Sequence, residues 1–499
     1  MKHKNIIEYL SSKYPHHTWV LVHKRSLRSV YRLDADDVPE YFVKIYDPET
    51  ALEKLRNLLR SRTLYEARVL AQLSSSGIYV PEVHAHVRFY AASALVTRAI
   101  VPATPAYEIE HKRQADIMLG LAVQLLKNNF FFTDMHAGNI VLDSDDRPCL
   151  LDAYEIEPCK RITTGHIISL FAQVQNTCDV TDDVLIKALE GLGTGYDSAK
   201  LAHEIRRKSF ALRLRYVKKR VKRSLRQGSF SQSIPGDGYR AYVRRGYSLD
   251  LDDVLYRHKE NIRHKTHVLK YQEKTQLSRV HDYCVKTYKT SSRLCSPYAL
   301  RSWKGLLTLY FNRINVAEPV AIGLFDDRSS VLITHILDHP DLDVFFWKDY
   351  PGLLPKDKRI IAAAFGQMIG CLHSLNIYHA DLKACNIKIE ADKVCFFFLD
   401  TDRIEQRRSI SYANRLKNLV QINTSIPVHI SRSLRMIFLH AYAAHTGDDP
   451  HVLFQDVWKR SADREILFCT PSGDRIEVWP KTDIAESALQ QYLPGDNCP

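Results

Sequence analysis

The order of apolar and polar positions is the same in the two halves of the chain. Each half has an early β-rich run, YFVKIY at 41–46 and YCVKTY at 283–288. A long segment with apolar residues at helical spacing comes later in each half, at 115–129 and at 360–376. The pattern therefore predicts, twice over, a small strand-rich lobe followed by a mostly helical lobe, which is an α+β fold.

Shorter helical segments connect these parts. Apolar residues at helical spacing predict one helical segment at 52–73 in the first half and another at 298–311 in the second. Both follow the β-rich run, so the two halves agree in this respect as well.

A repeat at nearly constant spacing joins the two halves. Three pairs of matched residues are separated by 242, 247 and 248 positions: Lys44 and Lys286, Asp134 and Asp381, and Asp152 and Asp400. Because this separation hardly changes, the two copies have nearly the same internal layout. A unit of this length is a duplicated domain and not a short solenoid repeat.

Three side chains around a short hairpin are the candidate chemistry of each half. They are Asp134, Asn139 and Asp152 in the first half, and Asp381, Asn386 and Asp400 in the second. The hairpin brings the Asn and the final Asp together, and their side-chain oxygens suit Mg²⁺. The first Asp can orient a hydroxyl group or accept its proton, and a Lys on an early strand can neutralise nucleotide phosphates. Phosphoryl transfer needs these parts.

The segments around these residues are similar to those of known kinases. YHADLKACNI at 378–387 is similar to the catalytic-loop pattern H-R-D-L-x-x-x-N, and FLDTD stands where D-F-G is expected. RLKNLVQINTSI follows at 415–426. With these features, the region 223–447 resembles the bacterial lipopolysaccharide core-sugar kinases, the Kdo and heptose kinases of the protein-kinase-like superfamily. The first half, at 19–205, resembles them more distantly, and its TDMHAGNIVL is also similar to aminoglycoside kinases.

The resemblance implies two tandem protein-kinase-like bilobal domains that use ATP and Mg²⁺. It implies that the catalytic residues are Asp381 and Asp134. It assigns metal binding to Asn386, Asp400, Asn139 and Asp152. It assigns contact with the ATP phosphates to Lys286 and Lys44, with Glu66 as the partner of Lys44. His379 is expected to shape the catalytic loop.

Two features depart from the kinase pattern. Neither half has a G-x-G-x-x-G loop, and SIPGDGYRAY at 233–242 and RSLRSVYRL at 25–33 are only loose substitutes. The second half also has no Asp or Glu between Lys286 and Glu318, and Ser302 stands near the place of the expected carboxylate. Either Lys286 is held by another acid, or that domain binds nucleotide poorly.

The formal net charge of +13 predicts an anionic partner. Part of the excess lies at 206–226, where apolar residues recur at helical spacing among Lys and Arg. This segment either packs its apolar stripe on a neighbouring domain or lies on an anionic membrane surface. We therefore expect kinase-like domains at 1–205 and 227–450, a basic helical linker between them, and an extension with a β-hairpin at 451–499.

Other features favour the cytoplasm. No apolar run is long enough to span a bilayer, and the N-terminus lacks the apolar block of a secretory signal. The ten cysteines form no C-x-x-C pair, which indicates reduced thiols. Peripheral contact with the inner face of the inner membrane would fit the positive charge.

The leading hypothesis is an ATP-dependent kinase that phosphorylates a sugar hydroxyl of the lipopolysaccharide inner core, Kdo or heptose, or another anionic glycan or small molecule. Two alternatives are a nucleotide-binding pseudokinase in one or both domains, and a protein Ser/Thr kinase. RLKNL at 415–419 follows Asp400 too closely for a long activation segment, which favours a glycan acceptor. A nucleic-acid binder using 206–226 is a third option, but no nucleic-acid fold supports it and no nucleic-acid partner is expected.

Overall fold

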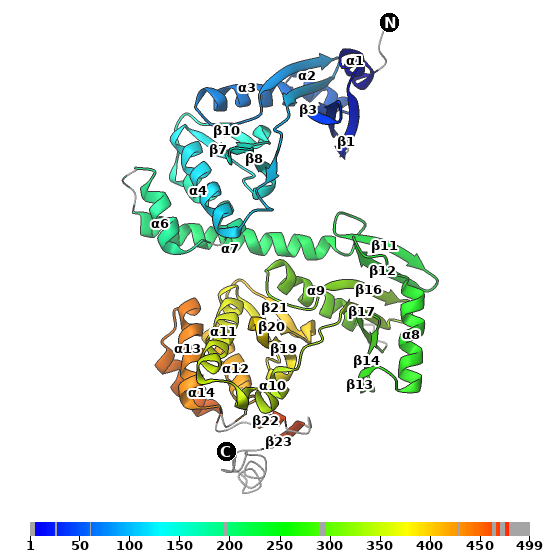
Figure 1. Cartoon of the computed structure of the whole chain (residues 1–499), viewed down its shortest axis with the longest axis vertical. Coiled ribbons are helices and arrows are strands. Elements are labelled where there is room, and N and C mark those ends of the chain that lie inside the picture. The colour runs from blue at the N-terminus through cyan, green and yellow to red at the C-terminus, as the bar shows by residue number, and fades with distance from the viewer. Residues whose placement is uncertain are drawn as a thin grey trace. The chain divides into compact units, whose positions relative to one another are not determined.

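The chain forms two compact units, unit 1 (Met1–Arg213) and unit 2 (Leu214–Pro499) (Figure 1). The computed structural model describes residues 5–24, 27–59, 61–178, 180–193, 195, 197–289, 296–427 and 430–461, and the backbone of 466–469 and 475–478. No helix in these ranges is both long and apolar enough to cross a membrane.

Unit 1 begins with an antiparallel five-stranded sheet (Figure 1). Its strands, in spatial order, are β1 (Thr18–Lys24), β2 (Arg28–Ala35), β3 (Val38–Tyr46), β5 (Ala92–Arg98) and β4 (Val83–Phe89). Side chains alternate between the two faces of a strand. Val43 and Ile45 of β3 therefore enter one core together with α1 (Ile6–Lys13), and Lys44 faces the other side, where α3 (Arg62–Ser75) lies.

The remainder of unit 1 is mostly helical. Its longer helices are α4 (His111–Lys127), α5 (Thr164–Cys178), α6 (Asp182–Glu190) and the start of α7 (Ser198–Arg223). The strand pair β8 (Ile140–Leu142) and β9 (Pro148–Leu150) lies among them, extended by β6 (Thr104–Pro105), and β7 (Phe130–Phe132) pairs with β10 (Ile156–Pro158). The apolar face of α4 supplies Met118, Leu121, Ala122 and Leu125 to the core, so the helical spacing seen in the sequence is used as expected.

Unit 2 begins with a seven-stranded antiparallel sheet (Figure 1). Its strands, in spatial order, are β11 (Ser231–Gly236), β12 (Tyr239–Arg244), β16 (Pro319–Phe325), β17 (Ser330–His335), β15 (Tyr283–Tyr288), β14 (Thr275–Val280) and β13 (Val268–Gln272). The helix α8 (Leu251–His264) packs with Val285 of β15 in one core, whereas α9 (Tyr298–Phe311) belongs to the larger core of the unit.

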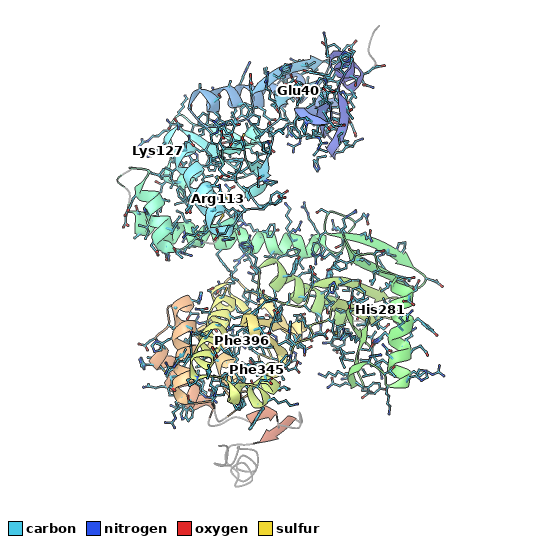
Figure 2. All side chains as sticks on the ribbon, viewed as in Figure 1. Glu40, Arg113, Lys127, His281, Phe345 and Phe396 are labelled. Atoms are coloured by element: carbon cyan, nitrogen blue, oxygen red, sulfur yellow. The ribbon has the colours of Figure 1, made fainter. Side chains whose placement is uncertain are left out.

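The helical part of unit 2 encloses that larger core. It contains α10 (Leu342–Lys348), α11 (Pro355–Ser374), α12 (Tyr412–Asn423), α13 (Arg432–Thr446) and α14 (Pro450–Ser461), and the strand pairs β18 (Ile377–His379) with β21 (Ile404–Gln406) and β19 (Ile387–Glu390) with β20 (Cys395–Phe398). Phe345 of α10 and Phe396 of β20 both lie in this core (Figure 2). The FFF run at 396–398 is thus a core strand.

The mixed helix and sheet content confirms the coarse fold prediction. The division at 213/214 falls inside the expected linker 206–226, while the finer domain boundaries stay predictions. In the extension at 451–499, β22 (Ile466–Cys469) and β23 (Arg475–Val478) pair as an antiparallel hairpin. The turn of this hairpin lies outside the described residues.

The basic segment uses its apolar stripe for packing. Most of it forms the second part of α7, where Val217 is buried in the core of unit 2 and Val221 packs against that core, and Leu225, just after the helix, packs there as well. Earlier in the same helix, Leu201 and Ile205 are buried in the core of unit 1. Of the two alternatives for this segment, the structure favours the packed helix.

The helix α9 touches the segment that follows Asp400. Thr401 Oγ1 donates a hydrogen bond of 2.9 Å to the backbone oxygen of Ser302. Gly305 lies so close that a Cβ atom added to it would stand 1.8 Å from the backbone oxygen of Thr401. Glycine is therefore required here for close approach, and the contact fixes α9 against the 3₁₀ turn Thr401–Arg403.

We expect Gly305→Ala to destabilise the protein by about 2–3 kcal/mol, because the helix or the turn must move to remove a backbone overlap. Thermal unfolding followed by circular dichroism should show a fall of several degrees in the midpoint of unit 2. Gly352→Ala is the matched control, since a Cβ atom there meets nothing within 4 Å. Equal behaviour of the two variants would contradict the close-packing argument.

Candidate functional site

In unit 2 the backbone brings the three candidate side chains together. Asn386 Nδ2 donates a hydrogen bond of 2.9 Å to the backbone oxygen of Asp381. The backbone N–H of Leu399 donates to the backbone oxygen of Asn386 at 2.8 Å, which places the end of β20, and hence Asp400, beside Asn386. Because the amide nitrogen of Asn386 is used by the loop, its amide oxygen is the group left for a cation.

His379 is buried directly behind this loop. Its Nδ1 accepts a hydrogen bond of 3.2 Å from the backbone N–H of Asp381, so the ring proton lies on Nε2, which donates to the backbone oxygen of Leu399 at 3.3 Å. Burial lowers the pKa of His379, which keeps the ring neutral. The side chain thus holds the loop and the hairpin together, as the resemblance implied.

The helix α12 and the residues directly after it hold the loop in place through side-chain hydrogen bonds. Asn418 Nδ2 donates 2.6 Å to the backbone oxygen of His379, and Gln421 Nε2 donates 3.0 Å to that of Ala380. Ser425 Oγ accepts from the backbone N–H of Ala384 at 2.8 Å. The kinase-like motifs of the sequence do not point to these three residues. In RLKNLVQINTSI the three residues are polar and stand at positions i, i+3 and i+7, and their side chains are buried.

Lys286 is held by Asp400. The distance from Lys286 Nζ to Asp400 Oδ1 is 2.6 Å. Burial, the largest effect, raises the pKa of the Asp400 carboxyl, but the charge and hydrogen bond of Lys286 together with smaller effects such as that of Lys270 outweigh it, and the pKa lies below its ordinary value of 3.8. Ser302, near the place of the missing helix carboxylate, instead bonds to the hydroxyl of Tyr288 at 2.8 Å. Of the two alternatives raised by the sequence, another acid does hold this lysine.

Unit 1 has the fuller set of partners around its lysine. Lys44 Nζ donates a short hydrogen bond to Glu66 Oε1 on α3 and one of 3.1 Å to the backbone oxygen of Leu151. It also lies 3.6 Å from Asp152 Oδ1. Burial raises the pKa of Asp152, but the charges of Lys44 and Arg28 outweigh it and hold the pKa below 3.8.

The loop of unit 1 has the same backbone connections as the loop of unit 2. Asn139 Nδ2 donates 3.0 Å to the backbone oxygen of Asp134, and the N–H of Leu151 donates 2.9 Å to the backbone oxygen of Asn139. Asp134 is exposed, and its Oδ2 lies 3.6 Å from Nε2 of His136. The repeat seen in the sequence is thus a repeat of hydrogen bonds as well.

The segment expected to replace the glycine loop in unit 2 does not lie where that expectation requires. SIPGDGYRAY forms the hairpin β11–β12 at the edge of the sheet away from β15, so it does not stand beside Lys286. The hairpin next to β15 is β13–β14, with its turn at Glu273–Lys274. In unit 1, RSLRSVYRL does lead into β2 next to β3, and its residues 25 and 26 lie outside the described residues.

Two cations near the aspartates were not singled out in the sequence. Arg28 Nη1 on β2 lies 3.4 Å from Asp152 Oδ2. In unit 2 the charge of Lys270 on β13 also lowers the pKa of Asp400, after the larger effects of burial and Lys286. Sequence patterns cannot point to these two residues, because each is more than a hundred positions from its aspartate. Only the folded chain brings them near it.

The donor sets fit a hard cation held jointly with phosphate oxygens. Within the described ranges no group of three or more His, Cys, Asp or Glu could hold a metal ion. Each hairpin does offer one carboxylate and one amide oxygen, and Mg²⁺ in kinases is bound by few protein groups together with phosphates. In unit 1 Asp152 Oδ1 is buried and has no hydrogen-bond partner among the described residues, as expected of an oxygen available to a cation.

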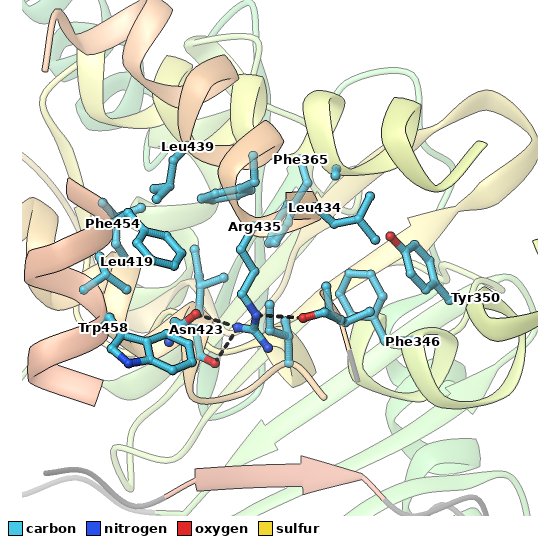
Figure 3. A pocket seen from close by; sticks show the side chains of 16 residues that line it. Phe346, Tyr350, Phe365, Leu419, Asn423, Leu434, Arg435, Leu439, Phe454 and Trp458 are labelled. Carbon is cyan, nitrogen blue, oxygen red and sulfur yellow. Dashed lines mark hydrogen bonds between the residues drawn. The ribbon is translucent and has the colours of Figure 1, made fainter. Parts of the chain in front are cut away.

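An apolar cavity of about 50 Å³ lies among the helices of unit 2 (Figure 3). Phe346, Phe365 and Trp458 are among its walls, and Arg435 is a polar exception. Burial lowers the pKa of Arg435 to about 10, and its guanidinium donates to oxygens of Asn423, Pro427 and Ile430. None of the candidate catalytic or metal-binding residues lines this cavity.

Comparison with known proteins identifies the region around the second site. Residues 257–442 match the family described as Lipopolysaccharide kinase (Kdo/WaaP) family. The C-terminal region is therefore similar to the Kdo/WaaP kinase family over these residues. The match includes Lys286, Asp381, Asn386 and Asp400, and it implies a kinase that uses ATP. It does not extend into unit 1, so the tandem arrangement stays a prediction.

Solved structures give neighbours of low similarity. The structure described as WaaP in complex with acyl carrier protein has 20% identity and a TM-score of 0.32, covering 39% of this chain and 86% of that one. WbdD, solved with a kinase inhibitor, has 19% identity and a TM-score of 0.28, covering 39% and 48%. The PknI kinase domain of Mycobacterium tuberculosis has 13% identity and a TM-score of 0.26, covering 39% and 96%. The comparison with curated proteins gave no match.

Lys286→Met should raise the pH at which unit 2 unfolds in acid. A carboxyl whose pKa is lowered in the folded state stabilises the protein at pH values above its ordinary pKa of 3.8. This stabilisation is lost as the pH falls through the pKa of the folded state. Without the ammonium, the burial of Asp400 raises its pKa, and the loss begins at higher pH. Acid titration followed by tryptophan fluorescence measures the midpoint.

Lys393→Met is the matched control for this titration. Lys393 also pairs with a carboxylate, Glu390 at 2.7 Å, but its side chain is 74% exposed. Pairs of this kind contribute little to stability. The control should leave the acid midpoint unchanged, and an equal shift in both variants would show that burial of the Lys286–Asp400 pair has no special effect.

Proposed function

We propose that the protein is an ATP-dependent phosphotransferase that phosphorylates a sugar hydroxyl of the lipopolysaccharide inner core, on Kdo or heptose. The observation that carries this proposal is the match of residues 257–442 to the Kdo/WaaP family, because that region contains the complete set Lys286, Asp381, Asn386 and Asp400.

The residues of unit 2 have distinct roles in this proposal. Bound ATP and Mg²⁺ would supply the phosphoryl group and neutralise its charge. Asp381 orients the sugar hydroxyl and accepts its proton, and Asn386 fixes the backbone of Asp381 through the 2.9 Å hydrogen bond. Asn386 and Asp400 offer the oxygens for the cation, and Lys286 holds Asp400 until phosphates compete for the ammonium.

Unit 1 is proposed as a second site of the same kind. Its support is the repeated hydrogen bonding around Asp134 and Asn139 and the pairing of Lys44 with Glu66. In unit 2 the missing helix carboxylate, replaced by Ser302, supports a different candidate role, a nucleotide-binding scaffold with little chemistry. The two units thus differ in which part of a kinase site is complete.

The acceptor is proposed to be a small anionic glycan and not a protein. Between Asp400 and the start of α12 at Tyr412 the chain forms only a 3₁₀ turn and the short strand β21, which leaves little chain to bind an extended peptide. The net charge of +13 suits a phosphorylated, lipid-anchored glycan at an anionic membrane. A location in the cytoplasm with peripheral contact at the inner membrane completes the proposal.

The test is Mg²⁺-dependent transfer of labelled phosphate from ATP to purified core glycolipid. Asp381→Asn should lower the rate by about a hundredfold or more if unit 2 is active, because the hydroxyl loses its proton acceptor. Asp134→Asn should do the same for any product of unit 1. Asp392→Asn, at an exposed position of the β19–β20 turn, is the control and should keep full activity.

The pattern of loss separates the candidate functions. Loss in one single variant assigns catalysis to that unit and makes the other a scaffold, and loss of a different product in each shows two kinases. If the intact chain binds ATP but transfers no phosphate to the glycolipid, the proposed glycan-kinase activity is wrong, and the scaffold and protein-kinase hypotheses are favoured.

A further inference from the structure

The short helix α2 (Ala51–Leu59) turns its apolar side to solvent. Leu52, Leu55, Leu58 and Leu59 are 59%, 54%, 46% and 81% exposed, and Asn57 is the buried residue of the helix. A surface helix normally does the opposite and places its leucines against the core. This helix therefore presents an apolar face with no partner in the described part of unit 1.

Polar contacts hold α2 in this orientation. Asn57 Nδ2 donates to the backbone oxygen of Ala91 at 2.7 Å and to Ser93 Oγ at 3.2 Å, and Asn57 Oδ1 accepts from the N–H of Arg62. Thr50 and Glu53 bond each other's backbone N–H groups, which caps the first turn. The exposed leucines thus belong to a defined helix that is fixed to the sheet.

The charges on α2 indicate what covers its apolar face. At 3.6 residues per turn the four leucines occupy an arc of about 120°, and Lys54 and Arg56 stand about 40° beyond its two edges. Both cations are exposed, and Arg88 adds a third at the C-terminal end by donating to the backbone oxygen of Leu58 at 2.7 Å. An apolar arc between two cationic margins is complementary to the interface of an anionic bilayer.

Two neighbouring features point in the same direction. Tyr90, next to the Ala91 that binds Asn57, is 80% exposed, and tyrosine is favoured at membrane interfaces. An open cavity of about 630 Å³ is lined by Leu59 and Arg56 of α2 and also by Thr133 and Tyr154. These last two residues are close in sequence to Asp134 and Asp152, so the cavity reaches from α2 toward the candidate site of unit 1.

We propose that α2 is an interfacial helix by which unit 1 lies on an anionic lipid bilayer, with its leucines among the lipid headgroups and Lys54 and Arg56 on lipid phosphates. The helix α7, whose apolar stripe is packed, offers no such face. The proposal deepens the proposed function and rests on it only for the idea that the acceptor is lipid-anchored, because the binding itself needs neither ATP nor acceptor.

The test is co-sedimentation of the intact chain with large vesicles of phosphatidylcholine and phosphatidylglycerol at a ratio of 7 to 3, and of phosphatidylcholine alone. We expect binding to the anionic vesicles and at least about tenfold weaker binding for Leu52→Ser/Leu55→Ser, because two apolar side chains leave the interface. The variant Lys54→Gln/Arg56→Gln should bind both kinds of vesicle equally, and salt should no longer weaken its binding to anionic vesicles.

The matched control is Leu354→Ser/Val452→Ser, which removes two apolar side chains of unit 2 that are 68% and 51% exposed. It should bind vesicles like the original chain, and the thermal midpoints of all variants should agree within a few degrees. Absence of binding to anionic vesicles, or equal binding by the leucine variant, would overturn the proposal. So would a dimer that becomes a monomer in the leucine variant, since the face would then join two copies of the chain.

Phosphate transfer to a lipid-free core glycan separates this proposal from the proposed function. The leucine variant should transfer at the rate of the original chain, because Leu52 and Leu55 contact neither the candidate site nor the cavity. Transfer without vesicle binding would disprove only the membrane contact, whereas vesicle binding without transfer would disprove only the kinase activity.

Discussion

Each unit depends on an ion pair between a strand lysine and the aspartate that ends a hairpin. Lys44 and Asp152 in unit 1, and Lys286 and Asp400 in unit 2, come from opposite lobes of their own unit. The side chains of Lys44, Asp152 and Lys286 are at most 19% exposed, so removing them from water is costly and a charge partner must offset that cost, whereas Asp400 stays 40% exposed. The position of the sheet relative to the hairpin is therefore set by this pair, and the loop that carries Asp134 or Asp381 takes its place from the same hairpin.

The two units satisfy their lysine in different ways, with consequences for cation binding. In unit 1 the buried Glu66 shares the lysine, and Asp152 Oδ1 keeps no hydrogen bond within the described ranges. In unit 2 Ser302 has no charge, so Asp400 bonds Lys286 directly at 2.6 Å. A cation at either aspartate must compete with cationic side chains, because Asp152 also lies 3.6 Å from Lys44 Nζ and 3.4 Å from Arg28 Nη1.

Much of the candidate site could be predicted from the sequence because its parts are local. Asp and Asn are five positions apart, and a short hairpin joins Asn to the second Asp, so spacing alone brings the three together. The order of strands in the sheet of unit 2 is not local. SIPGDGYRAY has the glycines of a phosphate loop. Its strand β12 pairs with β16, however, so the segment lies at the edge of the sheet away from β15. Likewise, Asn418 and Gln421 gain their meaning only from the loop that they contact.

The helix α2 shows a further limit of reasoning from sequence patterns. Periodicity at 52–73 predicts a helix with an apolar face but cannot say which face is buried, and the structure divides the segment into α2 and α3 at the cap residue Ser61. The hydrogen bonds of Asn57 contribute about 0.5–1.5 kcal/mol each, whereas burying a leucine contributes about 1.5–3 kcal/mol. Because the four leucines are 46–81% exposed, the free energy that they forgo is at least comparable to what the three hydrogen bonds of Asn57 recover. A helix held this way round gains from its leucines only when a second surface covers them.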